Sequence, residues 1–465
     1  MKKLNRRDFL RVSALTAAGA ALAGCAPKAA PTGAPAQLEP TVAPVEQPAP
    51  AEGTLIRFWT GWGGGAFVAA FQAILESEEF KAVLGDNTFE VKDSTPGEAM
   101  LTAIAGGDPP EAGANINYLD FIARGVCTPI ENLVASSQVV KKENFLEGHF
   151  DQCWYQGHMY GVPGIESFLR YGLNYNSKLV EAAGLDPTNP PVTWSEVYAW
   201  HEKLTKFDDA GNVLQVGLNP NDAMGEGAWF PDGWMAPISW GWDWFDEDSG
   251  KFDINNEKMV ESFATFKQFI DLVGVDNLAN MYSVEGHGTW GGAYNAEVQS
   301  MIVEGYWHPG ETMNEAPEVA QYNRATWLPV PESRRGVKVQ GGGTHMVLFF
   351  ANAKNTPGMF KAAEFIESKV ACDAFWNNLG WLPSVKSYYD TVDPSIYPGL
   401  DFYFASIDQI TEWWPPVYCP IIDFVSTEYY NLTDKVNRAE VTPEQAAEEL
   451  HNRCQAEYEA AGFGG

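Results

Sequence analysis

The feature of this sequence with the clearest chemical meaning is a cluster of tryptophans. Five of the 17 tryptophans fall within residues 229–244, interleaved with glycines and with the acids Asp232 and Asp243: Trp229, Trp234, Trp240, Trp242 and Trp244. Alternate residues of an extended segment point to the same side, so the last three would present their indoles on one face. A sugar ring has an apolar C–H face and a belt of hydroxyls, which suit aromatic faces beside hydrogen-bonding acids. The cluster therefore predicts a carbohydrate site, although the same rings also suit a packed core.

A glycine-rich turn is a second candidate for ligand contact. Residues 61–66 (Gly-Trp-Gly-Gly-Gly-Ala) fit the pattern GxGxxA between a predicted strand and a predicted helix. A dinucleotide-binding turn has this form, which leaves an exported NAD(P)-dependent sugar oxidoreductase as an alternative. The acid that such a site needs about 20 residues later is displaced, because Asp93 lies 32 residues after Gly61. The turn also suits a ligand that approaches the backbone, with Trp62 as a stacking wall.

Common catalytic and metal-binding motifs are missing from the sequence. It contains no GxxxxGK[ST], HExxH or GxSxG pattern, and its seven histidines are scattered without metal-ligand spacing. The acidic stretch 243–253 lacks the glutamate that closes a calcium loop, since Ile254 stands at the twelfth position, and a hairpin turn explains the stretch better. We therefore expect a protein that is not an enzyme and has no cofactor or metal. A secreted glycoside hydrolase remains an alternative, with Glu166 and Asp243 as its carboxylate pair.

The charge balance restricts the partners. The 465 residues include 61 acidic and 30 basic side chains, which gives a formal net charge of −31. Such a surplus of carboxylates repels phosphate backbones and anionic lipids, so no nucleic-acid partner is expected, and the ligand should be neutral or cationic. The length exceeds that of one ordinary hydrophobic core, which favours two lobes.

The first 53 residues have the composition of a targeting signal and a tether. Residues 1–24 begin with basic residues that include Arg6 and Arg7, continue with a short apolar run, and end before Cys25. This pattern resembles a twin-arginine export signal followed by a lipobox, in which Cys25 becomes the lipidated first residue. Residues 25–53 are rich in proline and alanine, which predicts an extended tether. We expect an exported protein that is lipid-anchored on the outer face of the cytoplasmic membrane, in the periplasm or at the cell surface.

Strand-like and helical periodicities alternate along the rest of the chain. Residues 54–60 and 88–92 are strand-like, and residues 66–80 form a helical stripe. Capping patterns start further helices at Thr193, Asn255, Thr356 and Thr442. The alternation predicts an α/β architecture with largely parallel sheets. Apart from Cys25 there are five cysteines, so at least one is free, and spacing alone does not decide whether Cys127 pairs with Cys153.

A series of short motifs, weak one by one, gains weight from its order and spacing. The motifs are Ala-Ile-Ala-Gly-Gly-Asp-Pro-Pro at 103–110, Gly-His-Met-Tyr-Gly-Val-Pro at 157–163, Asn-Tyr-Asn at 174–176, Ala-Gly-Leu-Asp-Pro at 183–187, Pro-Pro-Val-Thr-Trp at 190–194, the segment 301–307, Gly-Gly-Gly at 341–343 and Gly-Trp-Leu-Pro at 380–383. From about Thr54 onward the chain resembles the extracellular solute-binding proteins (family 1) of carbohydrate ABC transporters.

This resemblance implies an α/β, two-lobed, periplasmic-binding-protein type II (Venus-flytrap) fold with discontinuous lobes. Residues 54–165 with 336–369 would form lobe 1, and residues 166–335 with 370–465 would form lobe 2. A protein of this family captures a sugar or oligosaccharide between its lobes. It delivers the ligand to the transmembrane permease subunits of an importer whose ATPase is a separate protein.

The resemblance also implies which residues face the cleft. From lobe 1 these are Trp62, Gly63, Asn115, Asn117, Gly342, Gly343 and His345. From lobe 2 they are Trp240, Trp242, Asp243, Trp307 and Trp414, with Glu166 near the hinge.

Overall fold

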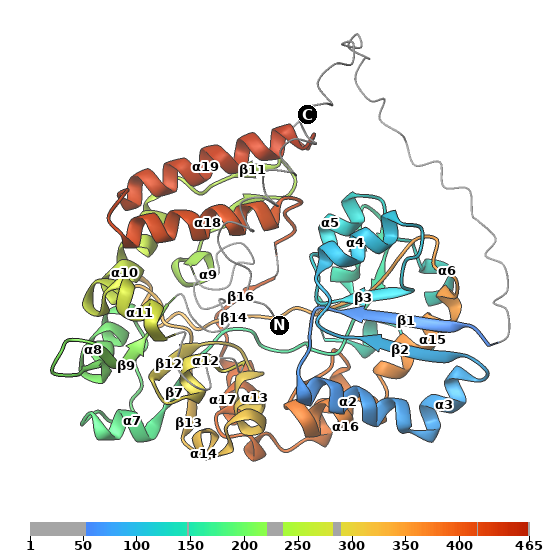
Figure 1. Cartoon of the computed structure of the whole chain (residues 1–465), viewed down its shortest axis with the longest axis horizontal. Helices are drawn as coiled ribbons and strands as arrows, with labels where there is room; N and C mark the ends of the chain where they lie inside the picture. Colours follow the sequence, from blue (N-terminus) through green and yellow to red (C-terminus); the bar gives the residue numbers. More distant parts are fainter. Residues whose placement is uncertain (1–52, 147, 221–235, 282–289, 416, 464–465) are drawn as a thin grey trace, which may run out of the picture. The chain divides into compact units, whose positions relative to one another are not determined.

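The computed structural model describes residues 53–146, 148–220, 236–281, 290–415 and 417–463. All of these residues belong to one compact unit (Figure 1). The predicted signal peptide, Cys25 and nearly all of the predicted tether lie outside the described residues, as do Trp229 and Trp234. Within the described ranges, no helix combines the length and the apolar character that crossing a membrane requires.

The first sheet has five strands in the order β2-β1-β3-β15-β6. Its strands are β1 (Leu55–Thr60), β2 (Thr88–Lys92), β3 (Ala112–Ala114), β6 (Gly161–Val162) and β15 (Val347–Phe349). Strand β1 runs parallel to β2 and β3, whereas β15 runs antiparallel to β3 and β6. The side chains of Ile56, Phe58 and Thr60 are fully buried, as the period of two along β1 predicts. The sheet is therefore mixed. The prediction of largely parallel sheets holds for β1, β2 and β3 and is wrong for the pairs that β15 forms with β3 and β6.

Helices pack on this sheet from two segments of the chain. They are α2 (Gly65–Glu76), α3 (Glu78–Leu84), α15 (Thr356–Ile366) and α16 (Lys369–Leu379), with α4 (Gly97–Ala105) and α5 (Tyr118–Ala123) on the other side in Figure 1. The predicted helix over 66–80 is divided because Ser77 caps α3 by accepting a hydrogen bond from the Phe80 N–H. Helix α16 packs on α2, where the rings of Phe71 and Phe375 lie 5.3 Å apart. The lobe boundaries, including the one at residue 370, stay a prediction.

The second sheet has the order β13-β7-β12-β9-β8. Its strands are β7 (Leu173–Asn176), β8 (Lys206–Phe207), β9 (Val213–Leu218), β12 (Gln299–Val303) and β13 (Asn323–Thr326). Only the β12–β9 pair is parallel. The surrounding helices include α7 (Ser177–Ala182), α8 (Trp194–Leu204), α12 (Gly292–Asn295), α13 (His308–Glu315) and α14 (Pro317–Ala320). The capping box predicted at Thr193 is confirmed, because Thr193 and Glu196 bond to each other's backbone N–H groups.

A group of long helices packs beside the second sheet. These are α10 (Glu257–Val273), α18 (Ile422–Asn437) and α19 (Pro443–Ala460). The apolar stripe predicted for α10 is buried along its whole length: Met259, Phe263, Phe266, Phe269, Ile270 and Val273. Its cap is Asn256, one residue after the predicted Asn255. The capping box predicted at Thr442 is confirmed at the start of α19.

The remaining α-helices and strands are short. They are α6 (Glu131–Val134), α9 (Ala236–Trp240), α11 (Val275–Met281), α17 (Leu400–Ser406), the strand pair β4 (Trp154–Tyr155) and β5 (His158–Met159), the pair β10 (Phe245–Asp246) and β11 (Lys251–Phe252), and the pair β14 (Val339–Gly341) and β16 (Glu412–Trp414). The β10–β11 pair is antiparallel, which confirms the predicted hairpin at Ser249-Gly250. Cys127, Cys153, Cys372, Cys419 and Cys454 are all buried and free.

Three hydroxyl groups form a closed hydrogen-bonded ring where distant parts of the chain meet. The side-chain oxygens of Ser167, Thr344 and Ser384 lie 2.8 Å from one another in all three pairs. All three residues are buried. The backbone of Gly164 lies against the ring: its N–H donates to Thr344, and its carbonyl oxygen lies 3.1 Å from the hydroxyl oxygen of Ser167 and 3.3 Å from that of Ser384. We call these three residues the hydroxyl ring.

Candidate functional site

A cavity of about 550 Å³ lies within the described unit. It collects residues that follow the carboxyl ends of strands in both sheets: Gly61 to Gly63 after β1, Asn115 to Leu119 after β3, and Trp307 with Glu311 after β12. Glu166, Arg170, Thr344 to Met346, Trp381 and residues 417–426 complete much of the lining. Ligands of α/β proteins bind at such strand ends, and the volume lies within the range of about 300–1,000 Å³ for small-molecule sites.

Aromatic rings form much of the wall of the cavity. The rings of Trp62 and Trp381 lie 5.1 Å apart, and Trp381 stacks on Trp290 at 5.5 Å with an angle of 10° between the planes. On another wall, the Arg170 guanidinium lies 5.8 Å from the ring centre of Trp307. These packed rings hold one another in fixed orientations, so the cavity presents rigid apolar faces.

The close packing of the turn after β1 explains its glycines. A Cβ atom on Gly61 would lie 2.3 Å from the carbonyl oxygen of Asn115, and Gly64 has a φ of +104°. Asn115 itself has a φ of +51°, an uncommon value for a residue with a side chain. Such outliers concentrate at functional sites. The turn therefore brings the backbone next to Asn115 and places Trp62 at the cavity.

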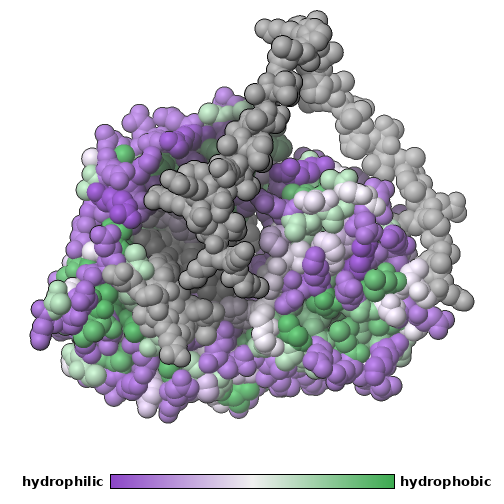
Figure 2. Space-filling view, viewed as in Figure 1, coloured by the Kyte–Doolittle hydropathy of each residue, from purple (hydrophilic) through white to green (hydrophobic). Residues whose placement is uncertain are grey.

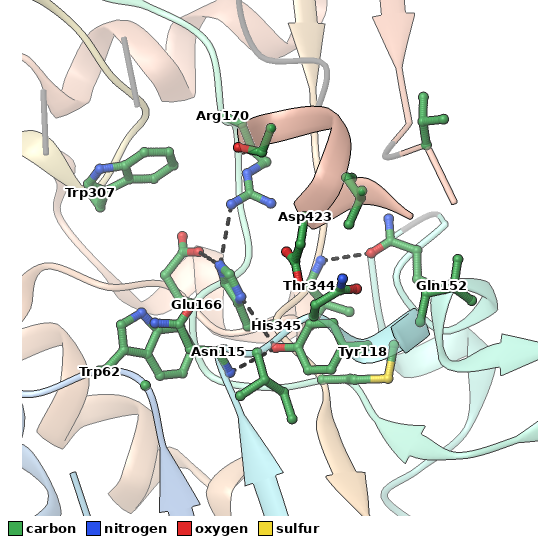
Figure 3. A pocket seen from close by; sticks show the side chains of 18 of the residues that line it. Trp62, Asn115, Tyr118, Gln152, Glu166, Arg170, Trp307, Thr344, His345 and Asp423 are labelled. Atoms are coloured by element: carbon green, nitrogen blue, oxygen red, sulfur yellow. Dashed lines mark hydrogen bonds and ion pairs between the residues drawn. The ribbon is translucent and has the colours of Figure 1, made fainter. Parts of the chain in front are cut away.

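A polar network crosses the floor of the cavity (Figure 3). The Nε2 atom of His345 lies 3.1 Å from Oε2 of Glu166 and 3.3 Å from a guanidinium nitrogen of Arg170, and its Nδ1 atom lies 3.3 Å from the hydroxyl of Tyr118. The Asn115 N–H donates to the same hydroxyl at 3.0 Å. If His345 carries its proton on Nε2, it donates to Glu166 and accepts from Tyr118, and Arg170 then acts on Glu166 through its charge.

The protonation states of this network follow from burial and charge. Burial lowers the pKa of His345, although Glu166 opposes the shift, so the ring is neutral at neutral pH. Burial disfavours the carboxylate of Glu166, but the hydrogen bond from His345 and the positive charge of Arg170 outweigh it, and the pKa of Glu166 falls below its usual value. Burial raises the pKa of Tyr118. The network therefore offers a ligand one carboxylate and one guanidinium with fixed positions.

The structure brings seven of the predicted site residues together around this cavity: Trp62, Gly63, Asn115, Asn117, Glu166, Trp307 and His345. The side chain of Asn117 also caps α5 by accepting from the Asp120 N–H. Figure 3 shows that Trp62 and Trp307 lie on either side of Glu166.

The structure places Trp240 and Trp242 elsewhere, in a buried core. Only 2% of Trp240 is exposed, and its ring stacks on Trp194 at 6.0 Å and meets Phe266 edge-on. The indole N–H of Trp242 donates to the Asp253 carbonyl at 2.9 Å. The extended segment that would align these rings does not form, because residues 236–240 are the helix α9. The packing interpretation of these two rings is the correct one.

The other predicted residues also lie away from the cavity lining. Asp243 is exposed to solvent. Gly342 and Gly343 are buried, and a Cβ atom on Gly342 would lie 2.8 Å from the ring of Trp413. Trp414 lies in β16 and donates its indole N–H to Glu412 at 2.7 Å. The two glycines therefore serve close packing, and the residues of this segment that line the cavity are Thr344 to Met346.

Several lining residues are missing from the predicted set. They are Gln152, Arg170, Glu311, Tyr418 and Asp423. Trp290 and Trp381 also line the cavity, and the sequence marks them as weaker candidates for stacking because each lies beside a glycine. Arg170 carried no signal, because its role depends on His345, which lies 175 positions later in the sequence.

Comparisons with known proteins agree with this fold. Residues 53–371 match the model of the bacterial extracellular solute-binding protein family. Because this match covers more than half of the sequence, the chain belongs to that family. A comparison with curated proteins by sequence gives no match.

Solved structures of similar fold have saccharides bound. CpMnBP1 with mannotriose has a TM-score of 0.74 and 16% sequence identity, over 86% of this chain and 100% of that chain. An ABC substrate-binding protein from Listeria monocytogenes with cycloalternan has a TM-score of 0.70 and 19% identity, over 89% and 100% of the two chains. Maltose-bound MalE3 from T. maritima has a TM-score of 0.67 and 18% identity, over 86% and 99%. This likeness confirms the predicted α/β, two-lobed fold.

Proposed function

We propose that this protein is the substrate-binding receptor of a carbohydrate ABC importer. It captures a sugar or oligosaccharide in the cavity and delivers it to the transmembrane permease subunits, which a separate ATPase drives. A ligand that touches both lobes would stabilise the closed form through its additional contacts, and the permease would recognise that form.

The observation that carries this proposal is the chemistry of the cavity wall. Trp62 and Trp307 provide flat apolar faces, and Glu166, Arg170 and Asn115 lie beside them. A neutral polyhydroxylated ring needs this combination, because its C–H face stacks on indoles and its hydroxyls donate to carboxylates and accept from guanidinium groups. The saccharides bound to the similar structures support the same ligand class.

Titration calorimetry against neutral saccharides tests the proposal. We expect one or more of mannotriose, maltotriose and tagatose to bind with a defined stoichiometry of one. Tight binding of peptides or polyamines, together with no heat from any saccharide, would refute the ligand class.

The predicted glycosidase pair, Glu166 with Asp243, receives less support from the geometry. A glycosidase needs two carboxyl groups on opposite sides of one bond, one of them with a raised pKa. Asp243 lies away from the cavity lining and the pKa of Glu166 is lowered, so the proposed pair lacks both properties. We propose that the protein does not transform its ligand. Chromatography of a bound saccharide after long incubation should recover it intact, and an oxidised or hydrolysed product would refute this.

We further propose that the mature protein is exported and anchored by a lipid on Cys25, with residues 26–53 as the tether. The order of the basic residues, the apolar run and the lipobox supports this proposal. A Cys25→Ala variant expressed in the native host should leave the membrane fraction. An unchanged membrane association in that variant would refute lipid anchoring at this residue.

A further inference from the structure

Glu311 is a buried acid in the cavity wall that the network of Glu166 and His345 does not use. It lies in the first turn of α13, lines the cavity and is only 4% exposed. Its Oε1 atom accepts a hydrogen bond from the indole N–H of Trp381 at 2.8 Å. Its Oε2 atom is also buried and has no hydrogen-bond partner among the residues that the structure describes.

The position of Glu311 is tightly fixed. The neighbouring Gly310 contacts the end of α16 so closely that a Cβ atom there would lie 2.2 Å from the Leu379 carbonyl oxygen. Trp381, which follows α16, stacks on Trp290 and carries the indole N–H that binds Glu311. The carboxyl group therefore cannot turn toward solvent without breaking this packing.

The ionisable groups around Glu311 disfavour its charge. Glu304 precedes α13, Glu315 ends it, and Glu166 comes from another segment; all three raise the pKa of Glu311 in addition to the larger effect of burial. His308 lies 3.0 Å from Glu304, but burial lowers its pKa to about 3, so it adds no positive charge at neutral pH.

The remaining neighbours bind other groups or stay neutral, so they do not shift Glu311 toward its charged form. Glu315 accepts from the backbone N–H of Trp290 and from the side chain of Asn295. The hydroxyls of Tyr294 and Tyr306 are buried and their pKa values are raised, so both stay neutral. Arg170 is directed to His345 and Trp307. Burial and the neighbouring carboxyl groups therefore raise the pKa of Glu311 and favour its neutral form. One of its oxygens is bonded to Trp381, and the other has no partner among the described residues.

We propose that Glu311 is a specificity-determining residue, whose protonated carboxyl group donates a hydrogen bond to an oxygen atom of the bound saccharide. A buried donor without a partner is unfavourable, and a ligand hydroxyl or ring oxygen in the cavity would satisfy it. The inference rests on the proposed function, because it assumes a saccharide in this cavity. It predicts that binding selects ligands with an acceptor at this position.

A dependence of affinity on pH follows from this arrangement. The ligand binds the neutral form, so affinity is constant while Glu311 is protonated. Above the pKa of Glu311 in the free protein, affinity falls by up to about tenfold per pH unit, because binding then requires uptake of a proton.

The test is calorimetry of the mature chain between pH 5 and pH 9 with mannotriose or maltotriose, whichever binds the unmodified protein more tightly. We expect the affinity of the unmodified protein to fall as the pH rises toward 9. Glu311→Gln, whose amide donates a hydrogen bond at every pH, should show a flat profile. Glu318→Gln, an exposed residue of α14, is the matched control and should keep the profile of the unmodified protein.

Infrared difference spectra give a readout that needs no ligand. The spectrum of the unmodified protein minus that of Glu311→Gln at pH 7 should contain the C=O band of a protonated carboxyl group. A missing band, an affinity that is flat or rises with pH, or an unchanged pH dependence in Glu311→Gln would overturn the inference. If the band is present and no saccharide binds, the proposed function fails, whereas a saccharide that binds with the same pH dependence in Glu311→Gln overturns the role of Glu311 alone.

Discussion

Replacement of Trp62 by alanine tests the stacking role of the cavity wall most directly. Trp62 is partly exposed, lines the cavity and rests on Trp381, so a ligand has access to its ring. The deeply buried Trp307 is a less suitable choice, because its truncation would also disturb the core. We expect Trp62→Ala to lower ligand affinity and to change stability much less than truncation of a buried tryptophan would.

The magnitude follows from the area that a sugar can cover. A tryptophan side chain buries about 150–250 Å² when fully enclosed, and a ligand on one face takes about a third of that, about 50–80 Å². At about 25 cal/mol per Å², this area corresponds to about 1.3–2 kcal/mol. The affinity should therefore fall by about 10- to 30-fold.

The assay is titration calorimetry with the saccharide that the unmodified protein binds best. Trp154→Ala is the matched control, because Trp154 is 37% exposed and lies away from the cavity lining. Circular dichroism and thermal denaturation check that both variants fold. An affinity of folded Trp62→Ala within about twofold of the unmodified protein would refute the stacking role.

Three further predictions concern stability and the thiols. Trp240→Ala should lower the free energy of unfolding by about 3–5 kcal/mol, the usual cost of a large core cavity, whereas an unchanged urea midpoint would contradict burial of this ring. His201 is buried, its Nδ1 accepts from the Leu218 N–H, and burial lowers its pKa from 6.5 to about 4. As the pH falls, His201 takes up its proton in the unfolded chain before it does so in the folded protein. This residue therefore lowers the free energy of unfolding by up to about 1.4 kcal/mol per pH unit between pH 6.5 and pH 4. In urea titrations, His201→Gln should reduce that slope, and an equal slope would refute the assignment. Finally, the five described cysteines should resist a thiol reagent in the native protein and all react in denaturant; three reactive thiols there would indicate a disulfide.

The sequence predicted the parts of the fold that depend on local patterns. The capping boxes at Thr193 and Thr442 and the apolar stripe of α10 are local signals, and the structure confirms them. Strand direction was predicted less well. The reversed direction of β15 depends on pairing with β3, far away in the sequence, and no local pattern encodes that pairing.

The site was only partly predictable for the same reason. Trp62 was identified because a glycine-rich turn after a strand has local meaning. Trp240 and Trp242 were misplaced because spacing by two suggests an extended segment, whereas α9 and the ring of Trp194 place Trp240 in a core. The contact between Arg170 and His345 joins residues from different segments, so only the folded chain reveals it.

The hydroxyl ring has a consequence for how this protein can change its specificity over time. Ser167 directly follows Glu166, and Thr344 directly precedes His345, so the ring fixes the backbone on which both of these cavity residues stand. Loss of one hydroxyl would leave the other two without a full set of partners in a place that water does not reach. New ligand preferences should therefore arise by exchange of side chains around the cavity, while the three backbone segments that meet at the ring keep their positions.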